Sequence, residues 1–328
     1  MADPNLGQLA ASVWEKKIGK KPSDNIFNSR ALIYALNKEG FKEEVDGGRL
    51  VEFSLEFATN TTHKSVGEFE QLDTSRIDVF DAARFEWKIV AGTVIYSELE
   101  RLRAQASAGK FDVIAEKMEN SKDSHLNELN TQFWSDGTGN SGKDIGGLQL
   151  IIATAPTTGT VGGINRGNFS FHRNQQASGI KTSTAYDNLV SVMRTVHNQC
   201  SSGGVKEMPT SAICGRATFE GYEGRLTVNE RYTYDTSRQV GRKGDAAFLN
   251  DALRFKQIPI FYDEAAVTDA VYFLNPKYLK VPYLSGAWMK MYPAVDPANQ
   301  LANVHKLATI CTMGTNNSRR LGVVTAIT

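Results

Sequence analysis

The most regular hydrophobic pattern in the chain is the strict alternation of the segment VEFSLEF, which begins at Val51. Such alternation is typical of a β-strand with one buried face. A polar stretch over 59–76 follows, and apolar alternation then returns, so the pattern predicts an extended antiparallel hairpin with a long polar tip. The predicted apolar face consists of Val51, Phe53, Leu55, Phe57, Phe85, Trp87 and Ile89.

This hairpin needs a surface against which to pack. A two-stranded ribbon alone is marginally stable in water, and a large exposed apolar patch usually marks an interface. Pattern alone leaves two partners open, a sheet of the same subunit or another copy of the chain. We predict a neighbouring copy.

A helical period follows the hairpin. Apolar residues at helical spacing predict a helix over 94–105, with Ile95, Leu99 and Leu102 on one face. The same period, kept over a longer stretch, predicts a helix over about 110–134. The glycines of SDGTGNSG end it.

The pattern beyond Gly147 is mixed α and β. It predicts strands over 147–154, 211–215, 253–263 and 270–275, and helices over 184–200, capped by Thr184, and 217–226. A polar loop is expected over 229–244. Two closing strands, 305–313 and 319–327, are expected to form a hairpin around GTNNS.

Composition narrows the class of protein. The 328 residues suffice for two compact units, and a hydrophobic content of 41% excludes global disorder. The net charge of +1 lacks the basic surplus typical of nucleic-acid binding. No signal-like start and no long apolar run is visible, so we expect a soluble protein of a reducing cytoplasm, without membrane contact.

The residues that carry chemistry in other proteins form no recognisable site here. The three cysteines are far apart, and the five histidines show no ligand spacing, so neither a disulfide framework nor a metal site is predicted. The loop Gly137–Lys143 imitates a phosphate loop, but a helix precedes it and Asp144 replaces the Ser or Thr that would meet magnesium. No GxSxG elbow occurs. We therefore expect no catalytic, cofactor-binding or metal-binding residue.

Charge is distributed unevenly along the chain. Residues 49–90 contain eight acids and five bases, a net charge of −3, whereas residues 276–328 contain six bases and one acid, a net charge of +5. Opposite charges of this kind can align neighbouring copies. The acids expected to pair between subunits are Glu52, Glu56, Glu68, Glu70 and Asp73, and the bases are Lys277, Lys306, Arg319 and Arg320.

The order of these elements resembles the major capsid proteins of tailed bacteriophages, which have the Hong Kong 97-type fold. The resemblance covers nearly the whole chain. It rests on the phrase from Phe133 to Gly139 (FWSDGTG) at the end of the long helix and on Gly147-Leu148. Ile258-Pro259-Ile260, the Asn275-Pro276-x-Tyr278-Leu279 phrase and the two closing strands fit the late region of such proteins.

The resemblance implies an α+β fold with four parts. Residues 1–48 would be an N-terminal arm and 49–91 the extended β-hairpin loop over an adjacent subunit. Residues 92–140 and 286–328 would form the peripheral domain, with a spine helix over about 110–134. Residues 141–285 would form the axial domain around the capsomer centre.

The function implied is structural. The chain would self-assemble through hexamers and pentamers into the icosahedral head of a virion, built in the bacterial host cytoplasm around double-stranded DNA contacted non-specifically. Implied partners are a portal, a separate scaffolding protein, since no long N-terminal extension is present, and decoration or cement proteins. Lys64 lies near the hairpin tip, where some members form cross-links, but we infer none. The alternatives are an encapsulin-like compartment shell and, from another class, a cytosolic α/β nucleotide-binding enzyme.

Overall fold

The computed structural model describes residues 30–106, 113–181, 186–202, 204, 207–227, 253–256 and 258–326. By its internal contacts the chain divides into two units. Unit 1 contains Ile89–Leu129 and Gly286–Ile310, and unit 2 contains Ser29–Lys88, Asn130–Ser285 and Cys311–Thr328. The Thr184 cap and the loop over 229–244 lie outside the described residues.

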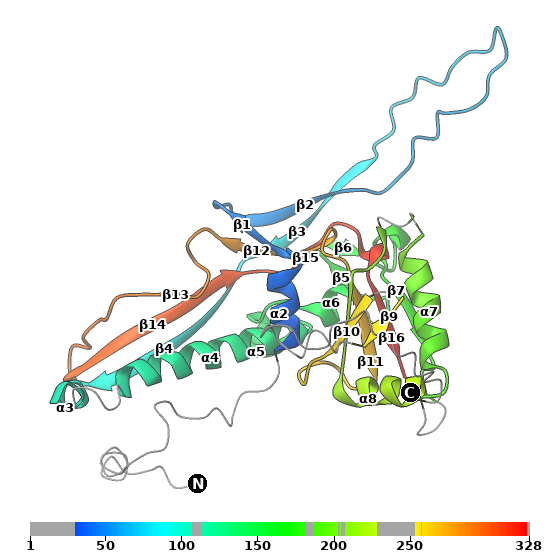
Figure 1. Ribbon diagram of the computed structural model, residues 1–328. Coiled ribbons are helices and arrows are strands. Elements are labelled where there is room, and N and C mark those ends of the chain that lie inside the picture. The colour runs from blue at the N-terminus through cyan, green and yellow to red at the C-terminus, as the bar shows by residue number, and fades with distance from the viewer. Residues whose placement is uncertain are drawn as a thin grey trace, which may run out of the picture. The chain divides into compact units, whose positions relative to one another are not determined.

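Unit 2 is organised around a six-stranded mixed sheet (Figure 1). Its strand order is β7 (Gln175–Ser178), β16 (Gly322–Thr325), β11 (Ala270–Leu274), β8 (Ser211–Cys214), β10 (Ile258–Tyr262) and β9 (Arg254–Phe255). The central strands β8 and β11 are buried at every position, as expected of strands covered on both faces.

Two helices pack against this sheet. Helix α7 (Leu189–Cys200) contacts β7 and β16, and α8 (Arg216–Thr227) contacts β10. Leu189, Met193 and Val196 of α7 repeat at helical spacing and join Val271 and Phe273 in one core cluster. The predicted strands over 211–215 and 270–275 and the helix over 217–226 are confirmed here. The single strand predicted over 253–263 is instead divided into β9 and β10, which pair antiparallel with each other.

A buried carboxylate joins three distant segments of unit 2. Asp263 is fully buried and accepts a 2.9 Å bond from the backbone amide of Leu32, in the first turn of α2 (Ala31–Lys38). The side-chain amide of Asn130 donates to the same carboxylate at 3.0 Å. The backbone N–H of Leu32 has no partner within the helix because it lies in the first turn, so Asp263, 231 positions away, accepts its hydrogen bond and caps the start of α2.

A second group of strands in unit 2 also pairs segments that are distant in sequence. Strand β1 (Lys42–Val45) runs parallel to β12 (Leu279–Leu284), which also pairs with β15 (Gly314–Thr315). Four short elements precede strands of the main sheet along the chain. The hairpin strands β5 (Thr160–Val161) and β6 (Ile164–Asn165) and the 3-10 turn η1 (Ser170–His172) come before β7, and the 3-10 turn η3 (Ser318–Arg320) comes before β16.

Unit 1 is built from long elements. Strands β4 (Lys88–Ser97) and β13 (Lys290–Met291) pair with β14 (Ala302–Cys311), and helices α3 (Glu98–Ala106) and α4 (Val113–Trp134) complete it. The buried His125 of α4 lies 2.7 Å from Thr309 Oγ1 of β14. The long helix predicted over about 110–134 is confirmed, whereas residues 94–97 of the predicted short helix belong to β4 instead.

Gly147 explains part of the motif at the end of α4. A Cβ at this position would collide with the carbonyl oxygen of Phe133, so the returning chain can pass the helix end only as glycine. Gly147 also donates its N–H to the Ser135 carbonyl at 3.1 Å. The short helices α5 (Gly139–Gly142) and α6 (Leu148–Ile151) follow, and the strand predicted over 147–154 is therefore wrong.

The predicted terminal hairpin is also wrong. Strand β14 pairs with β4, β12 and β13, whereas β16 inserts between β7 and β11 of the main sheet. The intervening GTNNS segment forms β15 and enters η3 instead of a two-strand turn. Alternation correctly indicated that both segments are strands, but it carries no information about which strands they pair with.

Candidate functional site

The predicted hairpin exists and has a regular ladder. Strand β2 (Leu50–Glu56) pairs antiparallel with β3 (Phe80–Glu86) over seven residues, with Val51 opposite Phe85 and Phe53 opposite Ala83. Opposite residues share a face, so the predicted apolar face is confirmed up to Phe85. Trp87 lies between β3 and β4 and donates its indole N–H to the Gly48 carbonyl, and Ile89 belongs to β4.

The base of the hairpin packs on its own chain. Val51, Leu55 and Phe85 are buried, and the rings of Phe53 and Phe85 meet edge to face with centroids 5.6 Å apart. A Cβ on Gly314 of β15 would collide with both rings. Glycine at position 314 thus lets the two aromatic rings lie directly on the backbone of the late region.

Part of the apolar face of the hairpin already has a partner within the subunit, because Val51, Leu55 and Phe85 are buried. Phe53 and Trp87 are partly buried, whereas Phe57 is exposed and Ile89 is 65% exposed. Packing on a neighbouring copy stays a prediction for the side chains that remain accessible.

The tip of the hairpin, residues 58–79, differs from the base. The ring of Phe69 is 94% exposed and Leu72 is 68% exposed. Sequence reasoning missed both residues because they do not alternate with their neighbours. The signal that could have revealed them is the pair of large apolar residues inside the otherwise polar EFEQLD segment.

Polar contacts order the tip internally. Lys64 binds Glu70 at 2.6 Å, and Glu70 accepts the Gly67 amide at 3.1 Å. Asp73 accepts the Ser75 amide at 2.9 Å. These bonds depress the pKa values of the Glu70 and Asp73 carboxyl groups below their ordinary values. The charged groups of the tip therefore shape its turns while the apolar side chains face solvent.

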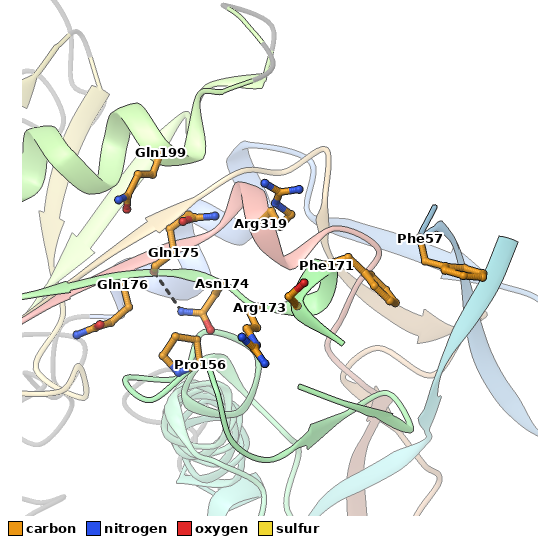
Figure 2. Close-up of a pocket in the computed structure, with 10 residues that line it drawn as sticks. Phe57, Pro156, Phe171, Arg173, Asn174, Gln175, Gln176, Gln199 and Arg319 are labelled. Carbon is orange, nitrogen blue, oxygen red and sulfur yellow. Dashed lines mark hydrogen bonds between the residues drawn. The ribbon is translucent and has the colours of Figure 1, made fainter. Parts of the chain in front are cut away.

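A cavity of about 570 Å³ lies beside the hairpin base (Figure 2). Phe57 and Phe171 form one side of it, with ring centroids 5.8 Å apart, and Arg173 and Arg319 supply positive charge. Amide side chains complete the lining. The remaining residues are Pro156, Ser170, Asn174, Gln175, Gln176 and Gln199.

Two buried basic side chains support the loops near this cavity. Arg166 donates to the carbonyls of Leu150 and Ile151 at the end of α6, a position where a positive charge is favourable. Burial lowers the pKa of Arg166 to about 10. Burial, and then the nearby Arg166 charge, lowers the pKa of His172 to about 4, so the imidazole is neutral near pH 7.

Several residues in the predicted ion-pair set already have partners within the chain. Glu52 pairs with Arg84 at 2.8 Å, Lys277 pairs with Glu207 at 2.6 Å, and Arg320 donates to the carbonyl of Cys200 at 3.3 Å. Glu70 and Asp73 are engaged in the tip. Of the predicted ion-pair residues, Glu56, Glu68, Lys306 and Arg319 make no side-chain hydrogen bond or ion pair with the described part of the chain.

The structure offers no support for chemistry at the loop over 137–143. The Asp144 carboxylate lies against Gly139, in the space that a bound phosphate would need, and its charge would repel one. Burial raises the pKa values of Cys200, Cys214 and Cys311 to about 12, which keeps these thiols protonated. The described residues contain no group of three or more His, Cys, Asp or Glu side chains placed to hold a metal ion.

No protein-family model matches this sequence, and no curated protein matches it. Solved structures do match in fold. The capsid asymmetric unit of Cyanophage A-1(L) superposes with a TM-score of 0.68 at 14% identity, covering 99% of this chain and 98% of that chain. The chain has the tailed-phage capsid fold.

Two further capsid-fold structures show how widely this architecture is shared. The capsid of a native GTA particle matches with a TM-score of 0.59 at 10% identity, covering all of both chains. The holo-SrpI encapsulin complex from Synechococcus elongatus PCC 7942 matches with a TM-score of 0.60 at 8% identity, covering 97% of this chain and 94% of that chain. None of the described helices has the length and hydropathy needed to cross a membrane.

Proposed function

We propose that this chain is a structural shell subunit, the major capsid protein of a tailed bacteriophage, and that it has no catalytic role. The observation that carries the proposal is the capsid fold over the entire length of the chain. The hairpin tip supports it, because Phe69 and Leu72 lie close together in sequence and are both exposed, and neighbouring exposed apolar groups mark interaction sites.

Each part of the chain would have a different role in assembly. Residues 49–91 would reach an adjacent subunit, residues 92–140 and 286–328 would form the peripheral domain, and residues 141–285 would surround the capsomer centre. Copies would form hexamers and pentamers, with a portal, a scaffolding protein and decoration proteins as further partners. The near-zero net charge supports dense packing of copies, since strong like charge would oppose it.

The second candidate is a compartment shell of the encapsulin type, favoured by the encapsulin match at a TM-score similar to those of several phage capsids. Both functions need the same closed assembly and differ in what the shell encloses. A phage head would enclose double-stranded DNA, contacted non-specifically at its inner surface, whereas an encapsulin encloses protein cargo.

The test is to express the chain and inspect the product by negative-stain electron microscopy and analytical ultracentrifugation. We expect closed shells or ring-shaped capsomers. A stable monomer at micromolar concentration, with the hairpin resistant to proteolysis, would contradict the proposal. Genomic DNA inside particles purified from the native source would favour the phage head, and protein cargo without DNA would favour the compartment shell.

A further inference from the structure

Two features of unit 2 carry opposite charge and accessible aromatic groups but cannot meet within one chain. We propose that the hairpin tip of one copy, with Phe69 at its apex, inserts into the cavity lined by Phe171, Arg173 and Arg319 of a second copy. The inference rests on the proposed function as an assembling subunit and specifies the contact that joins neighbouring copies.

The tip is already ordered before it meets a partner. The bonds that the structure gives for residues 60–78 all remain within that stretch, and they include the Lys64–Glu70 pair and the Asp73–Ser75 turn. Phe69 is consequently presented on a shaped loop, with Leu72 nearby in sequence. Less conformational freedom is lost when an ordered loop binds, so such a loop binds more tightly than a disordered one.

The cavity has room for the tip. An apolar cavity of roughly 150 Å³ is enough to hold a benzene ring, and this cavity measures about 570 Å³. The ring of Phe69 from another copy can therefore enter beside Phe57 and Phe171, the two lining rings drawn in Figure 2. Aromatic pairs of this kind favour offset or edge-to-face contact.

Opposite charges on the tip and at the cavity favour this contact. Glu68 precedes Phe69 and makes no hydrogen bond or ion pair among the described residues, and the same is true of Arg319 at the cavity. Arg173 adds a second guanidinium, held by the carbonyls of Arg166 and Gly167 at 2.6 and 2.7 Å. An acidic tip therefore matches a basic receptor.

The tip of the same chain cannot fill this cavity. Phe57 lines the cavity at the end of β2, and Phe69 follows twelve residues later. An extended stretch of that length spans about 40 Å. The loop joining β2 to β3 continues outward from the paired strands in Figure 1. Its first residue, Phe57, meets Phe171, and the hydrogen bonds and ion pairs described for residues 60–78 stay within that stretch. The occupant must come from another copy.

The proposed contact is head to tail, because it joins two different surfaces. Such heterologous contacts continue from copy to copy and close into rings when the rotation permits. An isologous contact, in contrast, would end at a dimer. The head-to-tail contact thus predicts assemblies in which more than two copies are joined in succession.

Cysteine cross-linking distinguishes these possibilities. The three native cysteines are buried, so introduced surface thiols would be the reactive ones. The test variant is Gln71→Cys with Gln199→Cys, which places one thiol at the exposed tip, leaves the Phe69 ring in place, and places the other thiol at the cavity rim. The matched control is Phe80→Cys with Gln199→Cys, because Phe80 is an exposed ring of the same hairpin outside the tip.

After mild oxidation of assembled protein, we expect non-reducing electrophoresis to show a ladder of dimers, trimers and larger species for the test variant only. Gln71→Cys with Gln176→Cys provides a second pair if the first disturbs folding. Wild-type particles with no ladder from either pair would overturn the inference and leave the shell function intact. A ladder that stops at dimers, or an equal ladder in the control, would overturn it as well. A failure of the shell function itself would appear separately, as absence of particles from the wild type.

Discussion

The base and the tip of the hairpin belong to one continuous ribbon but satisfy their side chains in opposite ways. At the base, the side chains of Val51, Leu55 and Phe85 are buried within the chain, and the rings of Phe53 and Phe85 lie against Gly314. At the tip, the polar groups are satisfied locally while the rings and aliphatic groups of Phe69 and Leu72 remain in solvent.

The difference separates stability from association. Burial within the subunit contributes to folding whether or not other copies are present, since it removes apolar area from water in the monomer. Exposed apolar area contributes only when a partner covers it. A change at the base should therefore act on folding, and a change at the tip should act on assembly.

The largest effect is expected at the base. Phe85→Ala removes a buried ring that contacts Phe53, and such substitutions cost about 3–5 kcal/mol of the free energy of unfolding. Urea denaturation of unassembled protein measures this change. Phe69→Ala is the matched control and should shift stability by less than about 0.5 kcal/mol. Equal losses from both variants would contradict the division between base and tip.

Acid should weaken the region that supports the base. His172 has a pKa of about 4 when folded and about 6.5 when unfolded. The unfolded chain therefore binds the proton more readily, and stability falls as the pH drops from about 6.5 toward 4. By pH 4.5 the loss from this group is about 2 kcal/mol.

Comparison of wild type with His172→Gln tests this pH dependence. The free energies of unfolding at pH 7 and pH 4.5 should differ less in the variant, by about 2 kcal/mol. The tip carries His63, which is exposed, so His63→Gln serves as the control and should leave the difference unchanged. An unaltered pH profile in His172→Gln would show that this imidazole is not the responsible group.

A smaller effect is expected at the tip, and in assembly alone. Truncation of a central aromatic residue at an interface commonly costs about 2 kcal/mol or more, which corresponds to about a 30-fold weaker contact. Phe69→Ala should raise the protein concentration needed for assembly by about this factor, as measured by light scattering. Phe80→Ala, on the same hairpin, should assemble nearly normally, and a similar loss in both variants would indicate a general role of surface apolarity.

The smallest effect concerns charge. Exposed ion pairs contribute about 0.2–1 kcal/mol and are screened beyond about 8 Å at physiological salt. Glu68→Arg or Arg319→Glu alone should slow assembly a few-fold at low salt, and the two together should restore the rate. Lys306→Glu is the comparison variant because Lys306 is a base of the same late segment that lies outside the cavity. No rescue by the double variant would refute the pairing of these two residues.

The sequence pattern was sufficient for elements whose burial is decided locally. Alternation located β2, and the helical period located α4 and α7, because one face of each meets apolar surroundings. It failed at 147–154, where a short apolar run forms α6, since four or five apolar residues suit a buried turn as well as a strand.

Prediction of the candidate site was limited for a different reason. Glu52 and Lys277 are expected to meet a neighbour, and within the chain they already have partners that the fold brings from positions 84 and 207. The cavity collects Phe57, which directly follows β2, with residues of η1, β7, α7 and η3. Long-range meetings of this kind leave no local pattern, so Phe57 and Arg319 could be named individually but not placed in one cavity.

The contact of Gly314 with the hairpin base also has a consequence for the time course of synthesis. Phe85 and Gly314 are separated by 229 positions, and at about 5–20 residues per second the ribosome needs roughly 10–45 s to cover that distance. During this interval Phe85 can meet Gly162, but the rings of Phe53 and Phe85 lack the surface that Gly314 supplies. Asp263, which completes the start of α2, arrives similarly late. A nascent chain thus cannot present a finished hairpin until translation is almost complete, which delays premature association on the polysome and makes those early aromatic residues natural binding points for a chaperone.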